Sequence, residues 1–375
     1  MSDVNRRDAL RVLASTGLVV GGAATGVHAV SKRRGDQSMI VSQKSLPNQG
    51  PWPTLDPFLF CVHHQDAYPQ GDGALAPRAS LQGRRLGQDF SGRNGWSMYH
   101  GRSIPGFPKH PHRGFETITI VRDGLIDHSD SLGGRARYGA GDVQWLTAGH
   151  GISHAEMFPL IDAHRPNPTD FFQLWINLPA AKKRADPYFS MSWNEKIPRV
   201  HTQTDGEGDS LIRVIAGLYD GQTAPAPPPA SYARQVDSDI LILTIEMNGA
   251  TQVTLPACLT STTRALYTVA PSPVLINDEP LEGRRMAVLK SGAPHVLTSG
   301  PEGARLLLLQ AKPIGEPVVQ YGPFVMNTQA EIREAFRDYR VSEFGGWPWK
   351  RDDPVHGSSP QRFAQTPQGG REEPG

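Results

Sequence analysis

The chain has 375 residues, which is enough for two domains that each bury a substantial core. Its 38 Lys and Arg nearly balance its 37 Asp and Glu, so the formal net charge is +1 and bulk charge gives it no affinity for nucleic acid. The 39 Gly and 33 Pro favour many short strands joined by turns. Two cysteines, Cys61 and Cys258, are too few for a disulfide framework, and we expect both to be small buried residues.

The N-terminus has the pattern of an export signal. Arg6 and Arg7 precede a weakly apolar stretch at 12–27, and small residues at Val27 and Ala29 are typical of a cleavage site. We expect a twin-arginine signal peptide at 1–29 and therefore a periplasmic or otherwise exported protein, with no stable membrane insertion after cleavage. The alternative, a retained membrane anchor, is disfavoured by four glycines in a segment of low hydrophobicity.

A polar linker is expected at 30–52, and a first domain follows it at 53–199. Two pairs of candidate metal ligands lie in this domain, His110 with His112 and His154 with Glu156. The members of each pair are two residues apart, so on a strand they share one face.

The sequence between the two pairs has β character. A β-branched run, TITIV at 117–121, follows the first pair, and glycine-rich turns separate it from the second. If the pairs face each other inside a small barrel, three imidazoles and a carboxylate converge on one ion. Such a ligand set suits non-haem Fe(II), and Zn, Mn, Ni, Co and Cu remain alternatives. A single H-x-H motif is weak evidence for a metal site, because histidines near a strand end usually lie on the surface. The combination of the two pairs is far more specific.

Several segments resemble the pirin family of cupins, over about residues 57–349. They are HPHRGFETITIV, IDHSDS, GDVQWLTAGHGISHAEMF, FQLWINLP, GPFVMNTQAEIREAFRDYR and FGGWPW. The resemblance implies an all-β bicupin, in which two double-stranded β-helix barrels follow one another and only the N-terminal barrel binds metal. It further implies that His110, His112, His154 and Glu156 are the metal ligands, and that iron is the usual metal.

Two further residues are predicted near this site. In the general cupin pattern Glu116 would itself be a ligand, whereas the pirin pattern takes its carboxylate from Glu156. We therefore expect Glu116 beside the ligands, accepting an imidazole N–H. His150 stands where the family often has Arg and is expected near the site mouth, where a titratable ring would replace a permanent cation. His128 is expected in a turn that supports a loop.

The second domain is expected at 200–349, as a cupin barrel without metal. Apolar strand candidates recur there, such as ILILTI at 240–245 and RLLLL at 305–309. A helix is predicted at 329–340, because Thr328 and Glu331 form a capping box before a helical apolar pattern. The tail at 350–375 is rich in Pro, Gly, Gln and charge, and is expected to be disordered.

The resemblance implies an Fe(II)-dependent dioxygenase of quercetin 2,3-dioxygenase type. Its substrates would be a flavonol or related phenolic and O2, and Glu156 would serve as ligand and proton acceptor. One alternative is a metal-dependent regulatory or redox-sensing protein without turnover. Another is a bicupin that acts on a different small molecule, such as a sugar or a small aromatic. We expect a monomer.

Overall fold

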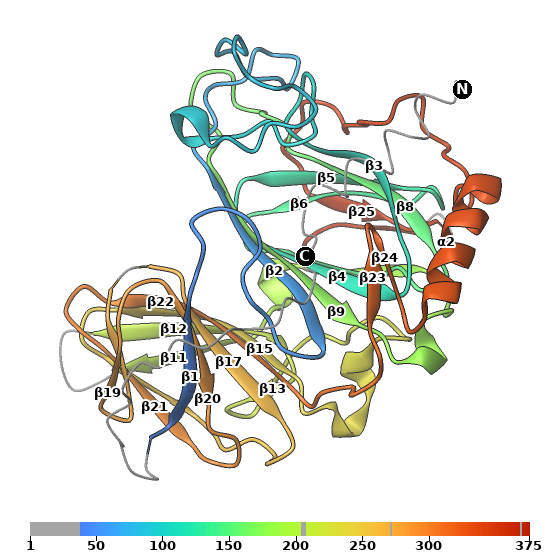
Figure 1. Ribbon diagram of the computed structural model, residues 1–375. Helices are drawn as coiled ribbons and strands as arrows, with labels where there is room; N and C mark the ends of the chain where they lie inside the picture. The colour runs from blue at the N-terminus through green and yellow to red at the C-terminus, as the bar shows by residue number, and fades with distance from the viewer. Residues whose placement is uncertain (1–37, 204–207, 271, 368–369) are drawn as a thin grey trace.

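The computed structural model describes residues 38–203, 208–270, 272–367 and 370–375. The predicted export signal at 1–29 lies outside the described residues. Two β-barrels lie side by side, and helix α2 (Gln329–Ser342) packs at the edge of the first (Figure 1). The all-β, two-barrel architecture that we predicted is confirmed. In the part of the chain that the structure describes, none of the helices has the length and apolarity needed to span a bilayer.

The first barrel is built from two antiparallel sheets. One has the strand order β10 (Tyr188–Ser192), β7 (Val143–Thr147), β4 (Phe115–Asp123), β9 (Thr169–Asn177) and β2 (Phe58–Asp66). The other has the order β26 (Arg371–Glu372), β25 (Phe363–Gln365), β6 (Arg135–Gly139), β5 (Leu125–Asp130), β8 (Ile152–Met157) and β3 (Gly106–His112). The β-branched run at 117–121 lies inside β4, as predicted.

The second barrel also has two antiparallel sheets. The larger has the order β1 (Ile40–Ser45), β20 (Arg285–Leu289), β17 (Thr263–Thr268), β22 (Ala304–Ala311), β15 (Leu241–Asn248), β12 (Asp209–Ala216) and β11 (Arg199–Gln203). The smaller has the order β16 (Gln252–Leu255), β21 (His295–Ser299), β18 (Val274–Ile276) and β19 (Glu279–Leu281). The predicted runs at 240–245 and 305–309 fall almost entirely within β15 and β22.

Short elements connect these sheets. Two hairpins are formed by β13 (Leu218–Tyr219) with β14 (Gln222–Thr223) and by β23 (Val319–Tyr321) with β24 (Phe324–Met326). The 3-10 turns are η1 (Arg93–Gly95), η2 (Ala180–Lys182), η3 (Asn194–Lys196), η4 (Tyr232–Arg234) and η5 (Val236–Ser238). Cys61 and Cys258 are free and buried, as expected.

One apolar core joins the two barrels. Strand β4 alternates, so that Ile118 and Ile120 face the second barrel while Thr119 faces the interior of the first. Ile118 and Ile120 belong to the same buried cluster as Ile242 and Tyr267 of the second barrel. The barrels therefore form one packed body, and the second supports the sheet on which the first is built.

The predicted linker at 30–52 contains a strand. Ile40–Ser45 forms β1, which pairs antiparallel with β20 at the edge of the second barrel. Only Ile40 of this strand is buried, and the rest of β1 is held mainly by its backbone. Composition could not reveal this strand, because a polar segment at a sheet edge gains its hydrogen bonds from the neighbouring backbone.

For the described residues of the tail, 350–367 and 370–375, the prediction of disorder is wrong. Phe363–Gln365 forms β25, which extends the sheet of the first barrel by pairing with β6. The side chain of Phe363 is buried, and Trp349 donates from Nε1 to the carbonyl of Asp130 at 2.8 Å. A few anchoring contacts thus order a segment whose average composition is polar.

The predicted helix is confirmed as α2. Thr328 caps it by accepting from the backbone N–H of Glu331, and the Glu331 carboxylate accepts from the Thr328 hydroxyl at 2.9 Å. The helix and the β23–β24 hairpin return to the first barrel, where Arg113 pairs with Asp338 at 2.8 Å. Gly114 permits this approach, because a Cβ there would lie 1.9 Å from the carbonyl oxygen of Val325.

Candidate metal centre

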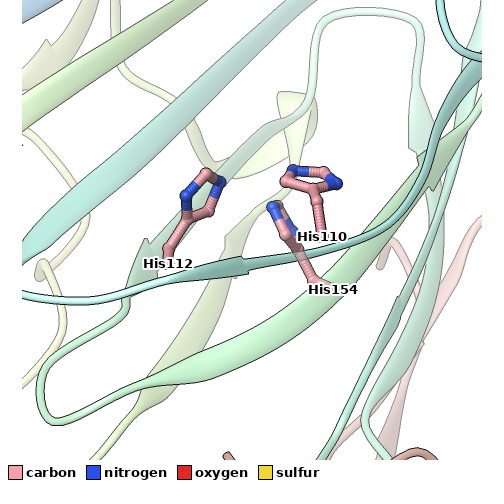
Figure 2. Close-up of side chains that lie close together, drawn as sticks. All are labelled: His110, His112 and His154. Atoms are coloured by element: carbon pink, nitrogen blue, oxygen red, sulfur yellow. The ribbon is translucent and has the colours of Figure 1, made fainter. Parts of the chain in front are cut away.

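Three histidines from two neighbouring strands meet inside the first barrel. His110 and His112 lie on β3, and His154 lies opposite His110 in the register of β3 with β8. Directly paired residues on adjacent strands point to the same side of a sheet, and so do residues two apart on one strand. Figure 2 shows the three rings converging from these two strands. Three ring nitrogens, one from each histidine, all lie within 4.8 Å of one another.

The environment keeps these imidazoles neutral. All three side chains are buried, with 0% of His154 exposed. Burial lowers the pKa of His110 to about 4, and it lowers the pKa values of His112 and His154 well below the usual range, with the neighbouring histidines adding to it. Neutral imidazole is the form that binds a metal ion.

The hydrogen bonding leaves ring nitrogens available. Nδ1 of His110 lies 2.8 Å from the carbonyl of Pro108, which fixes that nitrogen as the donor and leaves Nε2 as the free lone pair. Among the described residues, Nδ1 of His112 and both ring nitrogens of His154 are buried without a hydrogen-bond partner. Buried nitrogens are normally satisfied, so these residues fit a metal ion well.

Glu156 shares the inward face of β8 with His154 but lies outside this group. Its Oε1 accepts from Thr119 Oγ1 at 3.1 Å and from Tyr138 OH at 3.3 Å, and its Oε2 accepts from Gln173 Nε2 at 2.7 Å. Burial raises its pKa. The structure thus brings together three of the four predicted ligands, and the role of Glu156 as the fourth stays a prediction.

His128 is a residue that the sequence reasoning misplaced. It lies on β5 rather than in a turn, it is fully buried, and its ring centroid is 5.5 Å from that of His154. Its Nε2 lies 3.1 Å from Oδ2 of Asp130. The spacing His128-Ser-Asp130 was the available signal, because it places an imidazole and a carboxylate on one face of a strand.

Contrary to our prediction, Glu116 accepts from no imidazole among the residues that the structure describes. Its carboxylate accepts from Thr147 Oγ1 at 2.7 Å, from Ser231 Oγ at 2.7 Å and from the backbone N–H of Tyr232 at 3.3 Å. Ser231 and Tyr232 belong to the second half of the chain, so Glu116 lies between the barrels. The prediction failed because β3 ends at His112 and a turn at Gly114, with φ +85°, separates it from β4.

His150 lies on the surface, in the turn between β7 and β8. Its side chain is 50% exposed, and its Nδ1 lies 3.3 Å from the carbonyl of Ala185. Its own carbonyl accepts from the guanidinium of Arg113. Within the described part of the chain, no contact of His150 links it to the three histidines, and its predicted influence on the site mouth stays untested.

The fold and the cluster define a two-barrel protein with a candidate metal centre in its first barrel. Residues 42–176 match the family model described as Pirin, and residues 242–345 match the Pirin C-terminal cupin domain. The chain belongs to the pirin family.

Relatives and solved structures agree with this assignment. A Pseudomonas aeruginosa protein named "Putative quercetin 2,3-dioxygenase" is 37% identical over 63% of this chain and 79% of its own. Pirin-1 of Arabidopsis thaliana is 38% identical over 64% of this chain and 78% of its own. The crystal structure of quercetin 2,3-dioxygenase from Acinetobacter baumannii superposes with a TM-score of 0.65 at 26% identity, covering 82% of this chain and 98% of that one. The bicupin fold that the sequence predicted is therefore confirmed.

Proposed function

We propose that this protein is an Fe(II)-dependent dioxygenase of quercetin 2,3-dioxygenase type, which uses O2 to open a ring of a flavonol or a related phenolic. The observation that carries the proposal is the cluster of three buried, neutral imidazoles with unpartnered nitrogens beside a buried carboxylate. The names of the relatives from Pseudomonas and Acinetobacter supply the substrate class. Iron is proposed as the metal because the resemblance to pirins implies it.

His110, His112 and His154 would hold the ion through their free nitrogens. A bound divalent transition metal supplies Lewis-acid activation of a phenolic hydroxyl and a centre for chemistry with O2. Three protein ligands, or four with Glu156, would leave the ion able to bind small molecules as well. The geometry of His110 depends on its hydrogen bond with Pro108, which fixes the orientation of the ring.

In this proposal Glu156 receives the proton of a phenolic hydroxyl. Burial raises its pKa, and a carboxylate with a raised pKa is a stronger base while it stays ionised near neutral pH. Tyr138, Thr119 and Gln173 donate hydrogen bonds that hold its two oxygens in place. A rotation about its side-chain torsions would carry one oxygen towards His154, which lies on the same face of β8.

Aromatic rings lie beside the cluster. The ring centroids of Phe115 and Trp175 lie 5.0 Å and 5.4 Å from that of His112, and the ring of Phe107 lies 6.4 Å from that of His110. An apolar wall strengthens electrostatic interactions at the centre, and it suits a flat phenolic substrate.

The proposal is tested by loading the metal-free protein with Fe(II) under anaerobic conditions and then measuring O2 consumption with a panel of flavonols. We expect O2 uptake that depends on both iron and flavonol, with ring-opened product detected by mass spectrometry. Full iron binding without turnover of any phenol would overturn the dioxygenase and favour the regulatory or redox-sensing alternative.

The role of Glu156 is tested by Glu156→Gln, which keeps the shape and removes the charge. We expect metal affinity and turnover to fall by about 10- to 100-fold, the range typical when a metal site loses a supporting group. Glu116→Gln is the matched control, because Glu116 is also buried but bonds between the barrels. Equal metal retention in both variants would contradict a ligand role for Glu156.

We propose that the chain is exported through a twin-arginine signal at 1–29. The support is the residue pattern alone, with Arg6 and Arg7 before a weakly apolar stretch. N-terminal sequencing of the protein from a periplasmic fraction should begin at Val30. An intact Met1 confined to the cytoplasmic fraction would contradict it.

A further inference from the structure

A cavity of about 430 Å³ lies on the outer side of the first barrel, under the C-terminal tail. Strand β6 provides one wall: its Tyr138 points into the barrel towards Glu156, so Arg135 and Arg137 point outwards. The tail provides the other wall through Trp349, His356, Phe363 and Arg371. The volume is in the range of about 300–1,000 Å³ that is usual for small-molecule sites.

The cavity is positively charged. None of the ten lining residues is acidic, and three are arginines. Arg137 is neutralised by Asp127, with Nε and Nη2 each 2.6 Å from a carboxylate oxygen. Arg135 has a neutral partner instead, because its Nε donates to Oε1 of Gln365 at 2.9 Å. The hydrogen bond with Gln365 therefore leaves the positive charge of Arg135 without a compensating negative charge.

The third arginine is only weakly neutralised. Arg371 pairs with Glu373 at 2.8 Å, and the two side chains are 46% and 41% exposed. Exposed ion pairs are loosely held and screened, so Arg371 can turn to a ligand at little cost. Burial lowers the pKa of His356, so this ring stays neutral and contributes a polar group rather than a charge.

Aromatic side chains form flat walls next to these charges. The guanidinium carbons of Arg371 and Arg135 lie 4.5 Å and 5.9 Å from the ring centroid of Phe363. The ring of Trp349 lies 6.1 Å from that of His356, and its Nε1 is fixed by the Asp130 carbonyl. Guanidinium groups beside rings recognise a planar molecule with an oxyanion.

The walls are anchored before any ligand arrives. The backbone N–H of His356 donates to Oδ2 of Asp127 at 2.8 Å, and its Nε2 lies 2.8 Å from the carbonyl of His128. Arg137 also donates to the carbonyl of Ser359. Arg137 thus anchors the tail to β6, whereas Arg135 and Arg371 line the cavity.

We propose that this cavity binds a small organic anion, one that carries a carboxylate or phosphate group beside a flat ring. The oxyanion pairs with Arg135 and Arg371, and the ring packs against Trp349 and Phe363. This site is distinct from the candidate metal centre, which lies on the opposite face of the sheet. The assignment does not depend on the proposed dioxygenase activity.

The test is isothermal titration calorimetry of the full-length, metal-free protein with benzoate, phenyl phosphate, inorganic phosphate and uncharged benzyl alcohol. Metal-free protein is used because oxyanions also bind metal ions directly. Arg135→Gln removes the uncompensated charge, and Arg337→Gln is the matched control, because Arg337 lies exposed on α2. Arg137 is left intact because it anchors the tail.

We expect saturable binding of one aromatic anion per chain, weakened about tenfold or more in Arg135→Gln and unchanged in Arg337→Gln, as for the loss of one charge-assisted hydrogen bond. Preference for benzoate or for phenyl phosphate identifies the headgroup, and either result supports the proposal. Absence of saturable binding by every anion, equal binding of benzyl alcohol, or equal affinity in the two variants would overturn it.

Discussion

The two barrels share an architecture but have opposite interiors. The first buries three histidines together with Glu156, Thr119 and other hydrogen-bonding groups. The second is filled by aliphatic side chains, among them Leu243, Leu266 and Leu308, all fully buried. Burying polar groups costs free energy, whereas burying aliphatic groups supplies it. The comparison teaches that the first barrel holds the candidate metal ligands and that the second, through their shared core, supports it.

The second barrel also buries a histidine, His295, but this histidine belongs to no cluster of potential metal ligands among the described residues. His295 has one basic neighbour, Arg264, whose Nη1 lies 3.0 Å from its Nδ1. Burial lowers the pKa of His295 to about 4, so the pair carries one charge rather than two. Within the described residues, the only cluster of potential metal ligands is the one in the first barrel. His295 is therefore a packed core residue, whereas the three histidines of the first barrel form a candidate metal site because their side chains converge.

The largest effect is expected from His154→Ala. This change removes a fully buried imidazole from the centre of the cluster, and we expect metal affinity to fall by about 100-fold or more. Metal content measured by mass spectrometry after dialysis, with circular dichroism to confirm folding, checks this. His201→Ala, at an exposed position of the second barrel, should retain full metal. Undiminished metal in a folded His154→Ala protein would refute the site.

A stability effect without a metal effect is expected from Leu243→Ala. This residue is fully buried in the second barrel's core, and such truncations cost about 2–5 kcal/mol of unfolding free energy. Urea denaturation measures the loss, with Val236→Ala as the control, because Val236 is fully exposed and its truncation should cost less than about 0.5 kcal/mol. Loss of metal from natively folded Leu243→Ala protein would show that metal binding also depends on the core of the second barrel.

A pH-dependent effect is expected from Glu116, the carboxyl group between the barrels. Burial raises its pKa from about 4.5 to about 7, so the folded state binds its proton more tightly than the unfolded state. Its contribution to stability is complete below pH 4.5 and is lost as the pH rises through 7. The wild type should therefore lose stability relative to Glu116→Gln between these values, by up to a few kcal/mol.

Chemical denaturation of both proteins at several pH values tests this. The difference between their unfolding free energies should change with pH across 4.5–7, and it should level off on either side. A difference that stays constant with pH would show that Glu116 titrates normally despite its burial.

The smallest effect is expected from His150→Arg. The side chain is half exposed, its hydrogen bond with the Ala185 carbonyl is long at 3.3 Å, and the exposed carboxylate of Asp186 lies 3.7 Å from its Nδ1. Unfolding free energy should change by less than about 0.5 kcal/mol, and metal content should not change. Thermal denaturation and metal analysis check both. A large loss of metal would place His150 nearer the centre than the structure does.

The local patterns in the sequence predicted much of this molecule. Alternation and β-branched runs located strands such as β4 and β15, and the capping box at Thr328 located α2. The spacing of two H-x-H/E pairs predicted the cluster, because residues two apart on a strand must share a face. These features depend only on near neighbours in the chain, which is why they can be read directly.

Contacts between distant segments were decided by the tertiary structure alone. Glu116 points towards the second barrel because the turn at Gly114 interrupts the alternation of inward and outward side chains between β3 and β4. Glu156 lies among hydroxyl and amide groups that donate hydrogen bonds to it. β1 and β25 joined sheets whose other strands lie far away in the sequence, although both segments are polar. Edge pairing uses the backbone N–H and C=O groups that all residues except proline have, so amino-acid composition does not reveal it. The sequence by itself determined which residues could bind a metal, and only the packing of the strands determined which of them meet.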